Sequence, residues 1–275
     1  MIRSFLVFLS CCVLIKSRHF NGGIIEWAPI YPNRNASVVP ITITQSYFWT
    51  ANIMNCFVDV PITTIGRSGE NANLTCVSNC STDGGYSLSP INILTDCQKI
   101  NTLVNTMSSQ RSVSINLTAD AHLRIAYAAG DWVALNYPLI NNSKWSMVCS
   151  IDLRPRLDGL INTPPIASII SPQYAIVNRT TSITIGVSDV NVGDDVRCRW
   201  AIKNDTIDEC ADVCYPSSVP NGTYLSGCTI SFIGYVLNTW YAIAIQVCKR
   251  ERTKLVSNHL KSRSKTSSTL QLSHR

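Results

Sequence analysis

Apolar and polar residues alternate along most of the chain, and the helical spacing of three to four residues is scarce. Between residues 41 and 48, for example, Ile41, Ile43 and Tyr47 fall on one face of an extended chain, and threonine and serine fall on the other. This alternation, rich in β-branched and aromatic residues, is typical of half-buried strands. The pattern predicts an all-β protein.

The expected strands group into two β-sandwich-like units. Those of the first unit, residues 22–153, are Ile24–Trp27, Val38–Trp49, Val113–Leu117, Leu123–Ala128 and Trp145–Ile151. Those of the second unit, residues 166–247, are Ile166–Ile170, Tyr174–Val177, Ser182–Val187, Val196–Ile202, Thr229–Ile233 and Trp240–Val247. Arginines, a glycine and paired prolines interrupt the alternation over residues 154–165, and prolines favour extended, semi-rigid backbone. We expect that segment to be a linker.

The second unit has the strand spacing of an immunoglobulin-like sandwich, with Cys198 two residues before Trp200. Its segments PPIASIISP (164–172), ITIGVSD (183–189) and GDDVRCRW (193–200) resemble the opening of PKD-type and cadherin-like repeats. That resemblance implies an extracellular β-sandwich, although the number of cysteines departs from the usual pattern. The overall layout resembles secreted or surface proteins of invertebrates, which implies no particular activity.

The N-terminus has the pattern of a secretory signal peptide over residues 1–17. A positive charge at Arg3 precedes an apolar run from Phe5 to Ile15, and Ser17 offers a small residue for cleavage. The alternative, a membrane anchor, needs roughly 20 apolar residues, about twice this run. No other stretch reaches spanning length, so we expect a secreted, extracellular protein without a transmembrane segment.

Nine cysteines lie in the two expected units, and an oxidising compartment favours disulfides between them. They are Cys56, Cys76, Cys80, Cys97, Cys149, Cys198, Cys210, Cys214 and Cys228. Zinc is the weaker alternative, because no histidine lies near the closely spaced pairs. The sequons for N-glycosylation are at Asn35, Asn73, Asn79, Asn116, Asn141, Asn178, Asn204 and Asn221. We therefore predict that the protein has at least four disulfides and that it is glycosylated.

The net charge of +6 is concentrated at the C-terminus. Residues 249–275 carry eight basic and one acidic side chain, a charge of +7, so residues 1–248 sum to −1. A nearly neutral body offers no basic face to phosphates, which argues against nucleic-acid binding. Apolar alternation ends at Cys248, and we expect residues 248–275 to be a disordered basic tail. The sandwich would then lack its last strand, which is what a truncated or mis-spliced gene model would produce.

The densest carboxylate cluster is the segment around Asp189, Asn191, Asp194 and Asp195, which is a weak candidate for binding calcium, the ion that such ligands suit. The segment is not an EF-hand, because that loop needs glycine at its sixth place and glutamate at its twelfth. The favoured alternative is a turn between strands, which Asp and Asn support by bonding their own backbone.

Three further groups are candidates for chemistry or binding. The first is a set of carboxylates in a cysteine-bounded loop, which suit a cation site, a glycosidase pair or a solvated loop: Asp205, Asp208, Glu209 and Asp212. The second is His122, the only histidine expected within a folded unit, which we interpret as an exposed strand residue. The third is Trp132, which follows Gly130 and Asp131 and is the best candidate for an exposed ring that stacks on sugars.

No residue constellation dictates a reaction, and no cofactor is expected. The sequence predicts an extracellular binding or structural module of adhesion type, without catalysis, whose partners are other extracellular proteins or glycans. The alternatives are a secreted carbohydrate-binding protein and, more distantly, an enzyme with an unrecognised site.

Overall fold

The structure is a computed structural model, and it describes residues 19–32, 36–60, 73–130, 132–137, 143–156, 158–168, 171–191, 193–250 and, for the backbone alone, 264–274. The segment expected to be a signal peptide lies outside these residues. The strands are β1 Phe20–Pro29, β2 Val38–Thr50, β3 Thr75–Ser78, β4 Asp96–Asn101, β5 Thr106–Thr118, β6 His122–Ala129, β7 Leu135–Tyr137, β8 Trp145–Asp152, β9 Ile166–Ser168, β10 Thr180–Thr184, β11 Gly186–Ser188, β12 Asp195–Trp200, β13 Lys203–Asn204, β14 Ile207–Asp208, β15 Tyr224–Ser226, β16 Thr229–Ile233, β17 Trp240–Arg250 and β18 Ser264–His274.

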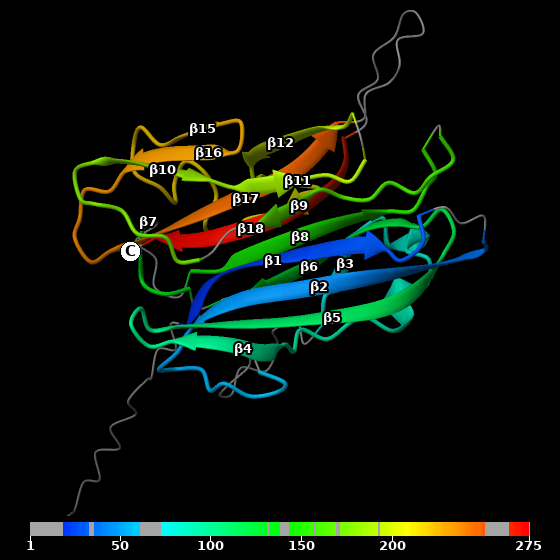
Figure 1. Ribbon diagram of the computed structural model, residues 1–275, viewed down its shortest axis with the longest axis horizontal. Coiled ribbons are helices and arrows are strands. Elements are labelled where there is room, and N and C mark those ends of the chain that lie inside the picture. Colours follow the sequence, from blue (N-terminus) through cyan, green and yellow to red (C-terminus); the bar gives the residue numbers. More distant parts are fainter. Residues whose placement is uncertain are drawn as a thin grey trace, which may run out of the picture.

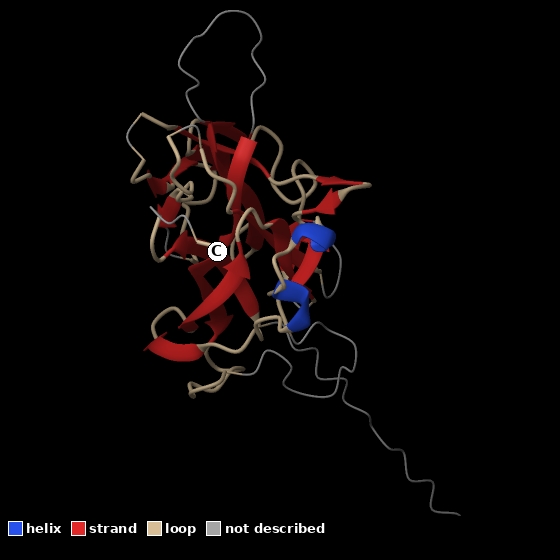
Figure 2. Ribbon diagram, turned by 90° about the vertical axis from the view of Figure 1, so that its right-hand side faces the viewer, coloured by secondary structure: helices blue, strands red, loops and turns tan. Residues whose placement is uncertain are grey.

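The all-β prediction is confirmed. The helical turns in the described part of the chain are η1 (Cys80–Thr82) and η2 (Tyr86–Leu88), which lie on one side of the molecule (Figure 2). The largest sheet has the strand order β3-β6-β8-β18-β1-β2-β5-β4, with β17 beside β18, and β12 and β7 beside β17 (Figure 1). Almost all of its neighbouring strands are antiparallel; β7 and β17 run parallel.

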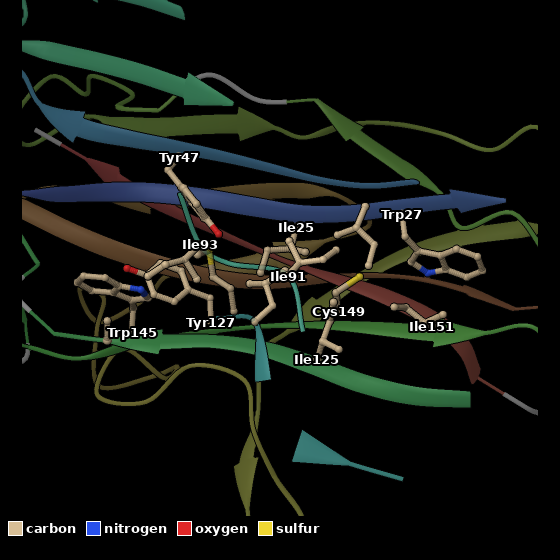
Figure 3. Packing of buried hydrophobic residues seen from close by; sticks show 14 of the residues in the cluster. Ile25, Trp27, Tyr47, Ile91, Ile93, Ile125, Tyr127, Trp145, Cys149 and Ile151 are labelled. Carbon is tan, nitrogen blue, oxygen red and sulfur yellow. The ribbon is translucent and has the colours of Figure 1, made fainter. Parts of the chain in front are cut away.

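The first core forms where side chains of β1 and β2 meet those of β6 and β8 (Figure 3). Strand β2 shows why: its odd-numbered residues are buried and its even-numbered ones partly exposed, as the alternation predicts. At one end of this core, the Phe20 ring stacks on Trp145 with centroids 4.0 Å apart and meets Trp132 edge-on at 4.8 Å.

The second core lies between β17 and the small sheet of β10, β16 and β15. Strand β17 serves both cores, because Ala242 and Ala244 enter the first, whereas Ile243, Ile245 and Val247 enter the second. The two expected units therefore share a strand and a sheet. The intervening segment, residues 154–165, is held by Arg156, whose guanidinium donates to the Asp194 carboxylate at 2.8 and 3.2 Å.

Two expectations for the second unit are wrong. Residues 174–177 form a loop instead of a strand. Tyr174 and Ile176 face solvent, so the alternating side chains have no core to pack against and the segment does not pair with another strand. Residues 182–187 divide between β10 and β11, which pair with different strands, β16 and β9.

The tail is not disordered throughout, since residues 264–274 form β18. This strand pairs antiparallel with β17 on one side and with β1 on the other. Edges of two strands with unpaired backbone groups recruit a third through backbone hydrogen bonds, which need no strong apolar alternation. Residues 251–263 lie outside the described part of the chain.

Candidate functional site

The segment expected to bind calcium or to form a turn connects β11 to β12, and it surrounds a lysine. Asp189 accepts a hydrogen bond from the backbone N–H of Asn191 at 2.8 Å, which is the expected turn chemistry. The ammonium of Lys249, on β17, lies 2.6 Å from an Asp194 carboxylate oxygen and 2.8 Å from the Asn191 amide oxygen. Asp195 lies apart from this group and pairs with Arg197 at 2.6 Å.

The second carboxylate group borders a groove of about 730 Å³ between β6 and the β13–β14 hairpin. Asp208 forms an ion pair with Lys203 at 2.7 Å, and Asp212 accepts the backbone N–H of Lys144 at 2.8 Å. Glu209 does not line the groove: it is buried and binds the Arg199 guanidinium through both oxygens, at 2.7 and 2.8 Å.

Other groups of the chain already engage Asp208. Asp208 lies close to Cys210 and Cys214, a grouping that suggests metal ligation, but the two sulfurs form a disulfide with each other. In addition, Asn204 at the rim is a sequon, and a glycan there would stand over the groove.

The structure places His122, His19 and Trp132 in environments that differ from those expected from the sequence. His122 is half-buried and contacts the Asp120 carbonyl at 3.0 Å and the Thr82 hydroxyl at 3.3 Å. His19, expected outside the folded units, is buried and stacks on Trp49. Trp132 is only 1% exposed, because its ring packs against Phe20 and Trp145, so it cannot stack on a sugar.

Eight of the nine candidate cysteines form four disulfides: Cys56–Cys97, Cys76–Cys80, Cys198–Cys228 and Cys210–Cys214. Cys149, a disulfide candidate, is instead a free thiol in the first core, and Cys248 is also free. Burial raises the pKa of both thiols. The fully buried Cys149 thiol is of the kind that is chemically inert.

Five of the candidate glycosylation sites are exposed, as a bulky glycan requires: Asn79, Asn116, Asn178, Asn204 and Asn221. Asn73 is half-buried, and Asn35 and Asn141 lie outside the described residues.

An apolar surface that the sequence analysis did not identify lies at one end of the molecule, the left-hand end in Figure 1. Three loops meet there, and we call the surface the apolar end: Leu103 from the β4–β5 loop, Tyr174 and Ile176 from the β9–β10 loop, and Val236 and Leu237 from the β16–β17 loop. Leu103 is 95% exposed and Leu237 is 72% exposed. A cavity of about 350 Å³ lies between the loops.

The apolar end carries little charge. Residues 101–105, 171–178 and 234–240 contain no Asp, Glu, Lys or Arg, although the β9–β10 loop ends with the sequon residue Asn178 and the exposed Arg179. Single exposed apolar residues are ordinary on protein surfaces, whereas contiguous groups of them are common at interaction sites. The sequence feature that could have indicated this surface is the apolar run at residues 174–177, which the alternation predicts as a strand.

No family model, curated protein or solved structure matches the chain. Within the described residues, no helix has the length and apolar character needed to cross a bilayer. The four disulfides are compatible with an extracellular location.

Proposed function

We propose that the protein is a secreted, non-catalytic binding module that engages another extracellular protein through the apolar end. The observation that carries this proposal is the meeting of three loops, with a single charged residue at Arg179, that expose Leu103 and Leu237 to solvent. Protein interfaces are depleted of charge at their centre and enriched in tyrosine, and Tyr174 and Tyr235 are exposed in these loops.

The position of these loops supports the same function. They project from the ends of strands that are anchored in two cores, so a rigid scaffold presents these loops to a partner. The partner's surface should itself be uncharged and apolar, because burying a charge against these loops would leave it unpaired. Trp132, the favoured ring for sugar stacking, is buried, so no specific observation favours the carbohydrate-binding alternative.

The test is a binding screen of the secreted protein against immobilised extracellular proteins and, separately, against a glycan array. We expect saturable binding to a protein ligand that weakens at least tenfold in a Leu103→Asp, Leu237→Asp double variant. Charged residues at the centre of an apolar interface commonly cost more than about 1.4 kcal/mol, which corresponds to tenfold in affinity.

The matched control is Leu88→Asp. Leu88 is 91% exposed but belongs to η2, away from the apolar end, so this variant should bind like the wild type. Equal binding by the double variant would refute the proposal, as would binding to glycans alone. Self-association that disappears in the double variant would show that the partner is a second copy of the chain, and would also contradict it.

A further inference from the structure

The amine of Lys249 is buried at the end of an apolar row. Ile243, Ile245 and Val247 precede it at alternate positions of β17 and face the second core. The Lys249 side chain continues that face with 0% exposure. A buried ammonium is costly unless other groups replace its water shell, so the surroundings of Lys249 must supply that shell.

Five oxygen atoms from four residues surround this ammonium. The Thr163 carbonyl lies 2.9 Å away and the Asn191 amide oxygen 2.8 Å away. The Asp194 carboxylate approaches to 2.6 Å, and the two oxygens of Asp189 lie at 3.4 and 3.2 Å. An ammonium has three N–H donors, fewer than the oxygens that face it. The arrangement is therefore a shell around a cation more than a set of paired hydrogen bonds.

The buried charges of this group balance. Two carboxylates, Asp189 and Asp194, face two cations, Lys249 and Arg156, and Arg156 also meets the half-exposed Asp158 carboxylate at 3.5 Å. Both carboxylates are nearly buried, with side chains 5% and 2% exposed. Without the lysine charge, the group would hold one uncompensated negative charge in an enclosed site. Carboxylate, amide and backbone carbonyl oxygens are also the ligands that calcium prefers.

We propose that Thr163, Asp189, Asn191 and Asp194 form a cation site whose resident cation is the ammonium of Lys249. In the native chain the site is filled internally, so folding needs no calcium. Removal of the lysine charge converts the same oxygens into a calcium site. This inference is independent of the apolar end and of the proposed binding function.

The experiment compares the wild type with Lys249→Met and Lys249→Asp. Methionine keeps an apolar stem but removes the charge, and aspartate adds a fifth ligand residue. Calcium chloride is titrated into chelator-treated protein up to millimolar concentration, the range in which extracellular calcium modules bind. Thermal unfolding and isothermal titration calorimetry report binding, because a ligand of the folded state raises the unfolding midpoint.

We expect calcium and chelator to leave the wild-type midpoint unchanged. Lys249→Met should unfold at a lower temperature without calcium and regain stability as calcium is added. Lys249→Asp should bind calcium at least tenfold more tightly than Lys249→Met. With Arg156 counted, the three carboxylates of that variant leave the site with two net negative charges, which match the charge of the ion. Adding Asp189→Asn and Asp194→Asn to Lys249→Met should abolish the response, which distinguishes this site from other carboxylates.

Three results would overturn the proposal. The first is a folded Lys249→Asp variant with no calcium response. The second is failure of both single variants to fold even in millimolar calcium, since the ion would then not replace the ammonium. The third is a wild-type midpoint that falls when chelator is added.

Discussion

Phe20 is the side chain whose loss should most clearly report how the N-terminal strand is anchored. Its ring is fully buried and lies among three indoles, stacked on Trp145 at 4.0 Å and edge-on to Trp132 and Trp49 at 4.8 and 5.4 Å. Truncating a buried phenylalanine to alanine costs about 3–5 kcal/mol, and each aromatic pair adds about 0.5–1.5 kcal/mol. Allowing for partial relaxation, we expect Phe20→Ala to cost about 4–6 kcal/mol.

That loss is a large share of the stability of a typical domain, about 5–15 kcal/mol. For a chain of this size it corresponds to a fall of roughly 10–20 °C in the unfolding midpoint. The assay is thermal unfolding of the protein followed by near-ultraviolet circular dichroism, which responds to the packed indoles. Phe57→Ala is the control: Phe57 is 59% exposed, so its loss should change stability by less than about 0.5 kcal/mol. Similar midpoints for the two variants would refute the docking of β1 in the first core.

Three further measurements test other parts of the structure. Burial raises the pKa of Glu26, so its neutral form is favoured in the folded state and the wild type loses stability as pH rises through that pKa. Glu26→Gln should therefore be more stable than the wild type at neutral pH in urea unfolding, with no advantage below the ordinary carboxyl pKa of about 4.5; an advantage that persists there would contradict this. The Cys198–Cys228 disulfide spans 30 residues, so replacing both cysteines by alanine should cost about 3–4 kcal/mol in guanidinium unfolding, and a loss under about 1 kcal/mol would count against the bridge. Thiol labelling of the processed protein should find Cys149 and Cys248 unreactive when folded and only these two reactive when denatured without reductant; further thiols would contradict the four disulfides.

Strands with clear alternation could be predicted from sequence because their pattern is local. Residues 38–49 were expected as a strand and lie in β2, and residues 229–233 coincide with β16. The disulfide framework was also predictable in number, since a signal-peptide pattern and nine cysteines imply an oxidising compartment. These inferences need only neighbouring residues and composition.

Tertiary structure decided which groups meet. The amine that fills the Asp189–Asp194 turn comes from Lys249, and no local pattern indicates that β17 places it there. Trp132 and Tyr174 show the same limit in opposite directions: a ring expected in solvent is buried, and a residue expected in a strand is exposed. Burial depends on which distant surface covers a side chain, and pairing depends on which strand edges remain open. The sequence by itself therefore predicted the all-β class, the strands with clear alternation and the number of disulfides, whereas the cation of the turn, the apolar end and the pairing of β18 followed only from long-range packing.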